Sequence, residues 1–253
     1  ENSSEYQTST SFKPFTKRQT LIKIKDQPTV TLNLLKTENG PVLFGSNLNL
    51  DAITPDGHVV SVASTLISPN DTSMEALINI MRSHTVEEAL KASQNYMAPG
   101  QNLILADRKD IAMKTIGSLP KRDKKHKSRG RMPTRGWLEV NRWQGVYDQS
   151  VNPIFLNPIG GILGNTNNKY TNKPFPKHIS YEWGDTQRVQ RWRRLMQNRS
   201  AHTRDSFIEA QLDNISPTAR NLLPLIGAEL WFEATKKDIT SSKIDNKLAL
   251  ELL

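Results

Sequence analysis

The sequence predicts an α+β fold, with strands in the first two thirds of the chain and helices in the last third. Apolar and polar residues alternate over 20–25 and 29–37, on either side of the turn residues Asp26, Gln27 and Pro28, which indicates a hairpin with one wet face. From about residue 185 onward, apolar residues recur at helical spacing. Because strands and helices do not alternate along the chain, we expect a layered arrangement without repeated βαβ units.

The rest of the first two thirds contains shorter elements. A helix is predicted over 73–82, capped by Ser73, because its apolar residues fall on one helical face. Thr85 and Glu88 form a capping-box pattern that opens a second helix, ending near Asn95. Further strands are predicted at 58–65, 103–106 and 111–116.

The last third contains signals for four helices. The first is rich in arginine and starts near 185, and Thr203 caps the second. Ser216 and Pro217 open the third, which should reach about Trp231, and the last covers 243–253. We therefore treat 1–253 as one partial domain, strand-rich over 12–170 and helical over 180–253.

The composition excludes several chemistries. The chain has 253 residues and no cysteine, so a disulfide scaffold, a thiolate metal site and a cysteine nucleophile are excluded. The formal net charge is +9. The stretch 121–135 holds eight basic residues and one acidic residue, so it carries seven of these charges. We expect 117–135 to be a solvated loop because it lacks hydrophobic periodicity.

The basic residues allow an alternative function, a nucleic-acid- or anion-binding module. Loop 121–135 and the arginine-rich helix would contact phosphates, with Trp137 and Trp143 stacking on bases. The helix would contribute Arg191, Arg193, Arg194 and Arg199. A charge run without apolar periodicity is more often a solvated loop, and tryptophans are more often core residues, so nucleic acid is not the expected partner.

Most catalytic motifs are absent. The sequence has no phosphate-binding glycine loop, no HExxH metal motif and no GxSxG nucleophile elbow. The five histidines are scattered without metal-ligand spacing, which favours structural roles and predicts no metal site: they are His58, His84, His126, His178 and His202.

The stretch 161–199 has a more specific pattern. A strand-like GILG segment (161–164) runs into an asparagine-rich turn, then a proline-bearing loop, then Arg188 near the start of a helix. An asparagine amide beside a fixed positive charge suits a site where negative charge develops on oxygen, as in acyl transfer. The residues alone are also compatible with an ordinary turn followed by an exposed helix.

The same stretch resembles the penicillin acylase (penicillin amidase) family of N-terminal-nucleophile amidohydrolases, in the order N-x-N-N, proline-bearing loop, then W-G-x-x-x-R. Four other segments resemble the family's β-subunit in collinear order: FKPFTKRQTLIKIK (12–25), ENGPVL (38–43), and the segments 98–122 and 204–226. The resemblance implies part of an αββα sandwich with peripheral helices. It also implies hydrolysis of a linear amide of the penicillin, cephalosporin side-chain or acyl-homoserine lactone type.

The resemblance also implies site residues. Asn167 corresponds to the asparagine whose side-chain amide donates to the oxyanion, and Arg188 to the arginine that shapes the acyl-transfer site. Asn165 and Asn168 are their neighbours. The nucleophile in this family is an N-terminal serine freed by autoproteolysis, with its own α-amine as base through a water.

That serine belongs upstream of the segment matched here, so the chain is expected to be an internal, inactive fragment of the β-subunit. Its partners would be the rest of the precursor, including the α-subunit, and a small-molecule amide substrate, with no membrane partner. No cofactor is expected, because Lys177 or His178 stands where the family has a calcium-ligand aspartate. The resemblance implies a periplasmic or secreted parent, and leaves open a family member that has lost catalysis. Exposed strand edges predict self-association of the isolated chain.

Overall fold

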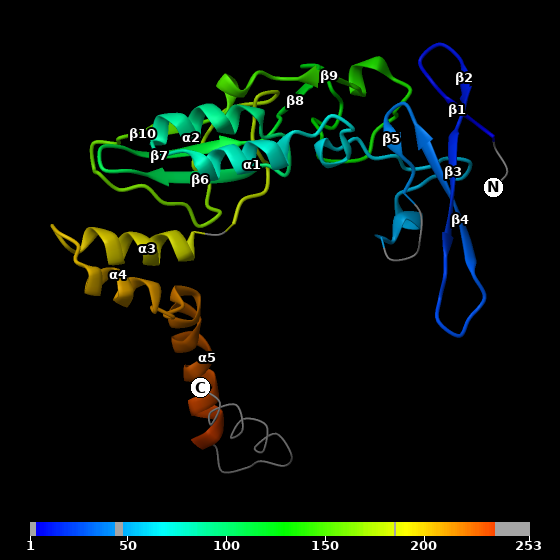
Figure 1. The fold of residues 1–253 in the computed structure, drawn as a ribbon. Coiled ribbons are helices and arrows are strands. Elements are labelled where there is room, and N and C mark those ends of the chain that lie inside the picture. The colour runs from blue at the N-terminus through cyan, green and yellow to red at the C-terminus, as the bar shows by residue number, and fades with distance from the viewer. Residues whose placement is uncertain (1–3, 44–47, 185, 236–253) are drawn as a thin grey trace. The chain divides into compact units, whose positions relative to one another are not determined.

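The computed structural model describes residues 4–43, 48–184 and 186–235 (Figure 1). The chain divides into two compact units. The first consists of Glu1–Gly164 and Thr171–Glu182, and the second consists of Asn165–Tyr170 and Trp183–Leu253. Helices and strands are both present, in agreement with the predicted α+β class.

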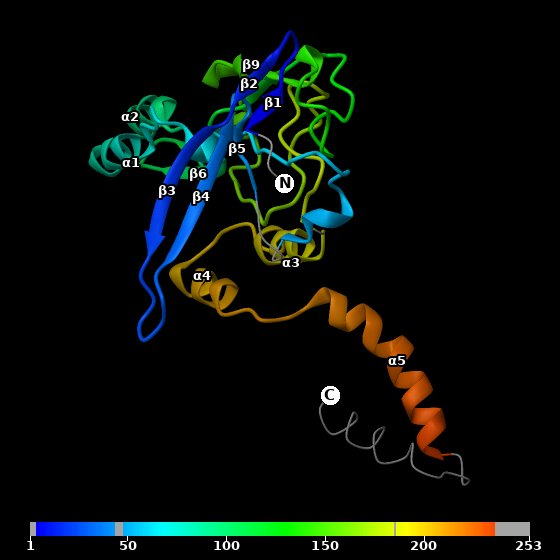
Figure 2. The same ribbon diagram turned by 90° about the vertical axis from the view of Figure 1, so that its right-hand side faces the viewer.

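The first unit begins with two ribbons. Strands β1 (Glu5–Gln7) and β2 (Phe12–Pro14) pair with each other, and β3 (Thr16–Ile22) pairs antiparallel with β4 (Val30–Thr37), which also pairs with β5 (Gly40–Pro41). Figure 2 shows β3 and β4 as a long ribbon. Its turn contains Asp26 with a φ of 59°. The predicted hairpin is confirmed, with its first strand starting before the predicted boundary.

The core of the first unit is a three-stranded antiparallel sheet in the order β10–β7–β6. These strands span Ile154–Leu156, Ile111–Ile116 and Gln101–Ala106, respectively. Helices α1 (Ser73–Arg82) and α2 (Val86–Ala92) lie along this sheet (Figure 1). Ala76 of α1 packs with Tyr96, Leu103 and Ile116, which places the apolar core between helix and sheet.

The predicted caps have different outcomes. The side chain of Thr85 accepts a hydrogen bond from the Glu88 N–H, which confirms the start of α2. Ser73 is instead the first residue of α1. Its Oγ donates to Asp71 Oδ1 (2.5 Å) and accepts from the N–H groups of Met97 and Ala98 (2.9 Å each), so it joins the helix to the chain that enters β6.

Two predicted strands are wrong. Residues 58–65 form only one isolated bridge, between Val42 and Ser61, and 161–164 are not a strand. A strand needs a partner along its length, and β5 beside Val42 is only two residues long. Two backbone hydrogen bonds hold the segments together there, from Leu43 N to Val60 O (2.8 Å) and from Val62 N to Pro41 O (3.0 Å). An ideal Cβ on Gly40 (φ 126°) would lie 1.9 Å from Val62 O, so only glycine permits this close approach.

The predicted solvated loop 117–135 is partly ordered by packing. Strand β8 (Pro120–Arg122) pairs with β9 (Trp143–Val146), His126 is buried and Arg122 is half-buried. Short 3-10 helices complete the first unit: Leu50–Ala52, Thr65–Ile67, Ser93–Asn95, Glu139–Asn141 and Gln149–Val151.

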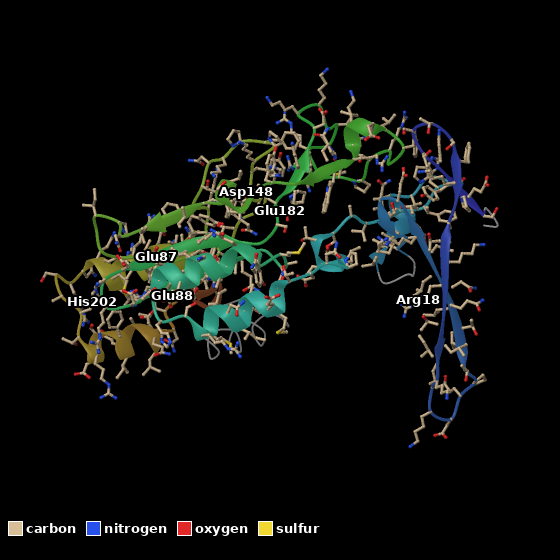
Figure 3. The ribbon with its side chains drawn as sticks, turned by 45° about the horizontal axis from the view of Figure 1, so that its top comes forward. Arg18, Glu87, Glu88, Asp148, Glu182 and His202 are labelled. Carbon is tan, nitrogen blue, oxygen red and sulfur yellow. The ribbon has the colours of Figure 1, made fainter. Side chains whose placement is uncertain are left out.

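The second unit contains α3 (Gln187–Gln197), α4 (Arg204–Gln211) and α5 (Pro217–Thr235). The Thr203 cap is confirmed, because its side chain accepts from the Ser206 N–H while Ser206 Oγ accepts from the Thr203 N–H. His202 lies in the connection between α3 and α4 (Figure 3), with Nε2 2.8 Å from Met196 O. The helix predicted over 243–253 lies outside the described residues. No helix in the described part of the chain is long and apolar enough to cross a membrane.

Candidate functional site

The candidate site is built on a turn of the second unit that contains three asparagines. Asn167 has a φ of 67°, a left-handed conformation that asparagine tolerates better than most residues. Asn165 stabilises this turn, because its Oδ1 accepts from the Asn167 N–H (2.9 Å) and its Nδ2 donates to Asn168 O (3.2 Å). The Asn165 side chain therefore closes the turn around Asn167.

Asn168 has a structural position in the same turn. Its side chain is buried, with 8% of the residue exposed. Its Oδ1 accepts from Thr166 N (3.1 Å) and Thr166 Oγ1 (3.2 Å), and its Nδ2 donates to Lys169 O (3.2 Å). Both polar atoms of this amide are therefore used within the turn.

The chain returns to the turn at Trp183 and Gly184. The Gly184 N–H donates to Asn167 O (2.9 Å), and the rings of Tyr170 and Trp183 meet edge to face with centroids 5.1 Å apart. An ideal Cβ on Gly184 would lie 3.1 Å from Asn167 O and 3.3 Å from Asn167 Cβ. A glycine here permits the close approach of the two segments.

Arg188 lies in the first turn of α3, and its guanidinium reaches the asparagine turn. Its Nη2 donates to Asn167 Oδ1 (2.7 Å) and to Thr166 O. Arginine has only donors, so the amide atom that faces it is the acceptor Oδ1. The Asn167 NH2 group therefore points away from Arg188, and it makes no hydrogen bond to any residue that the structure describes.

This arrangement presents an oriented amide donor. The guanidinium withdraws electron density from Oδ1, which strengthens the Nδ2 donor, and the closed turn reduces the reorganisation needed to reach an acceptor. Both side chains are exposed, so a reacting group could approach the amide. An oxygen that gains negative charge at about 3 Å from Nδ2 would be stabilised.

Other arginines of α3 and its C-terminal side form ion pairs. Arg191 binds Asp213 through Nε–Oδ1 (2.9 Å) and Nη2–Oδ2 (2.5 Å), and Arg199 binds Glu209 (2.5 Å). The hydrogen bonds with Asp213 raise the pKa of Arg191, and those with Arg191 lower the pKa of Asp213. Two of the four arginines in the nucleic-acid alternative therefore already face carboxylates.

The structure brings Asn167 and Arg188 into contact and assigns Asn165 and Asn168 to the turn that holds them. Two contributors to the site are not predicted from the sequence: Thr166, whose carbonyl is a second acceptor for Arg188, and Gly184. The glycine of the W-G-x-x-x-R pattern was the available signal. The contribution of Thr166 is a backbone carbonyl, which every residue type has, so the sequence pattern contains no signal for it.

The whole chain, residues 1–253, matches the penicillin amidase family. Relatives include two bacterial proteins named acyl-homoserine lactone acylase QuiP. The one from Pseudomonas aeruginosa is 26% identical over 81% of this chain and 24% of its own length. The one from Pseudomonas syringae pv. syringae is 30% identical over 73% of this chain and 22% of its own length. The penicillin acylase 2 proenzyme of Pseudomonas sp. SE83 is 21% identical over 81% of this chain and 26% of its own length.

The fold is similar to that of the thermostable penicillin G acylase from Alcaligenes faecalis. The TM-score is 0.69 at 19% identity, over 98% of this chain and 43% of that chain. This chain spans about a quarter of the length of the curated relatives given above. The match over all 253 residues shows that the chain belongs to the penicillin amidase family.

Proposed function

We propose that the parent of this chain is an amidohydrolase that cleaves a linear amide through an acyl-enzyme on an N-terminal serine. The chain contributes Asn167 as the side-chain oxyanion donor and Arg188 as the residue that orients it. The observation that carries this proposal is the hydrogen bond from Arg188 Nη2 to Asn167 Oδ1, which turns the amide N–H group outward.

The reaction proceeds in two acyl-transfer steps. The serine Oγ attacks the substrate carbonyl carbon, its proton passes to the α-amine through a water, and the carbonyl oxygen becomes negative. Asn167 Nδ2 donates to this oxygen, and Arg188 keeps the amide from rotating. Collapse of the tetrahedral intermediate breaks the C–N bond, and the leaving nitrogen takes the proton. Water then hydrolyses the ester by the same route.

The proposed substrate class follows from the relatives. The relatives are named acyl-homoserine lactone acylase and penicillin acylase, and both names support a substrate with a linear amide bond to an acyl group. We propose this bond type without choosing between the two kinds of substrate. The serine would come from a part of the precursor outside this chain, so the chain alone should be inactive.

The test is Asn167→Ala in the full-length precursor. Loss of one oxyanion donor lowers kcat by about 10²- to 10³-fold, with a smaller change in KM, because the hydrogen bond strengthens as charge develops. Lys169→Ala is the matched control, since Lys169 is exposed in the same turn. Gel analysis of processing separates loss of catalysis from loss of maturation. A kcat within twofold of the wild type in a processed Asn167→Ala protein would refute the role of Asn167.

A further inference from the structure

Segment 171–182 carries a stack of three rings within the first unit. The ring centroids of Phe175 and His178 lie 5.4 Å apart, with an interplanar angle of 36°. Those of His178 and Tyr181 lie 4.3 Å apart, at 34°. His178 therefore lies between two aromatic rings, and one continuous stack runs from Phe175 to Tyr181.

Two arginines of the basic stretch 121–135 cover the two ends of this stack. Arg129 Cζ lies 6.0 Å from the centroid of Phe175, and Arg131 Cζ lies 5.1 Å from that of Tyr181. Guanidinium groups at these distances are attracted to the negative faces of the rings. The two arginines, with Gly130 between them, thus contact the first and last rings of the stack.

A third arginine, Arg122, belongs to the same basic stretch 121–135. The half-buried guanidinium of Arg122 lies 5.5 Å from the Trp143 ring, and an ideal Cβ on Gly130 would come within 2.8 Å of Arg122 Nε. Gly130 has a φ of 81°, so a side chain there would meet both backbone strain and the guanidinium. The backbone between Arg129 and Arg131 therefore packs directly on Arg122.

Segment 171–182 is attached at two other points. Lys177 Nζ lies 5.8 Å from the Tyr147 ring, and Lys173 Nζ donates to Val151 O. In the described part of the chain, no ion pair involves Arg122, Arg129 or Arg131. Aromatic faces, and not carboxylates, are thus the observed partners of these arginines.

The side chains of segment 171–182 do not fit a calcium ion. Calcium is the ligand to consider here, because the resemblance to the family places a calcium-ligand aspartate in this loop. Calcium takes roughly six to eight oxygen ligands, with carboxylates prominent among them. Segment 171–182 has one acidic residue, Glu182, against Lys173 and Lys177. The described residues contain no group of three or more histidine, aspartate or glutamate side chains placed to hold a metal.

We propose that Arg129 and Arg131 anchor segment 171–182 to the basic stretch by stacking on Phe175 and Tyr181, and that this anchoring is independent of calcium. Arg129 and Arg131 therefore have an intramolecular role within the first unit.

Hydrogen–deuterium exchange of the 253-residue chain tests this proposal without a substrate, so the result is independent of the proposed acylase activity. Arg129→Gln/Arg131→Gln should speed amide exchange in peptides from 171–182 by about tenfold, since two cation–aromatic contacts are lost. Arg135→Gln is the matched control, because Arg135 is exposed in the same stretch and its side chain makes no such contact with the residues that the structure describes.

A second part of the experiment uses the wild-type chain and tests whether the anchoring depends on calcium. Amide exchange over 171–182 should be the same in excess EGTA and in millimolar calcium. Protection that appears only with calcium would overturn the proposal, as would unchanged exchange in Arg129→Gln/Arg131→Gln. If the double variant does not fold, Arg131→Gln alone supplies the arginine arm, with the same peptides and a smaller expected change.

Discussion

Arg188 Nη2 donates a 2.7 Å hydrogen bond to Oδ1 of Asn167, across 21 residues of sequence. The two side chains come from different local structures, the first turn of α3 and an asparagine-closed turn. The contact determines which atom of the amide faces outward, because arginine can only donate. The chemistry that we propose for Asn167 depends on this orientation.

Substitution of Arg188 should therefore lower catalysis in the full-length precursor. In Arg188→Met the Asn167 amide can rotate, and we expect kcat to fall by about tenfold or more while KM changes little. Arg193→Met, at another exposed position of α3, should retain wild-type kcat. Steady-state kinetics on processed protein measures both values. Equal kcat in the two variants would contradict the orienting role.

Gly184 should not tolerate a larger side chain. Its Cβ would come within 3.1 Å of Asn167 O, so Gly184→Val must displace the turn that Gly184 N–H also binds. We expect the Tm to fall by about 2–4 °C for each kcal/mol lost from the free energy of unfolding. Turnover in the full-length parent should fall as well. Gly160→Val is the control, since nothing lies within 4 Å of its Cβ. The measurement is thermal unfolding, and a similar Tm for both variants would contradict the close approach.

Acid should destabilise the first unit. Burial and the nearby charge of Arg122 lower the pKa of both His126 and His178. For His126, hydrogen bonding to the backbone and, to a smaller extent, the charge of Asp123 only partly offset this lowering of the pKa. The Nδ1 atoms of both rings are buried without a hydrogen-bond partner among the described residues. Because the pKa of each ring in the folded protein lies below the ordinary histidine value of about 6.5, the unfolded state binds more protons as the pH falls through that value. Stability should thus be full above about pH 6.5 and fall as the pH drops below it.

The measurement for this prediction is Tm from pH 7.5 to pH 5.0. His178→Phe keeps a ring between Phe175 and Tyr181 but cannot be protonated, so the fall in Tm should be smaller in this variant. His84→Gln, at an exposed position, should retain the wild-type fall. A flat Tm profile for the wild type would show that these two histidine rings do not control acid stability.

The isolated chain should self-associate through β3. This strand lies at the edge of its sheet, and one of its edges has no partner strand within the described residues. Leu21 is 65% exposed, and Ile22 and Val30 are 42% exposed. Open strand edges with apolar side chains pair with other copies. Light scattering should show a mass that rises with concentration, less so in Leu21→Lys. A constant monomer mass in the wild type would refute this prediction.

Local patterns predicted many elements of this fold. The alternation around Asp26 specifies the β3–β4 hairpin, because both strands and their turn are adjacent in sequence. The capping signals at Thr85 and Thr203 likewise act within one helical turn. The pattern at 58–65 also predicted a strand, and this prediction is wrong. A strand forms only where a partner strand runs beside it, and the neighbouring strand, β5, is only two residues long.

The basic stretch shows a different limit of sequence reasoning. Its charges and lack of apolar periodicity predicted solvent exposure, and most of its lysines are exposed. Arg122, Arg129 and Arg131, however, contact the rings of Trp143, Phe175 and Tyr181, which are distant in sequence. Guanidinium groups can pack on aromatic faces without a carboxylate, so net charge alone does not predict their environment.

By itself, the sequence determined the secondary-structure types in the long periodic segments, because these depend on local spacing and on residue type. The family, and Asn167 and Arg188 as its candidate site residues, came from the resemblance of whole segments to the penicillin acylase family. Only the tertiary structure decided which atom of the Asn167 amide faces Arg188 and which groups surround His178. Hydrogen-bond direction and ring stacking depend on the relative placement of segments far apart in the chain, and spacing along the sequence does not contain that placement.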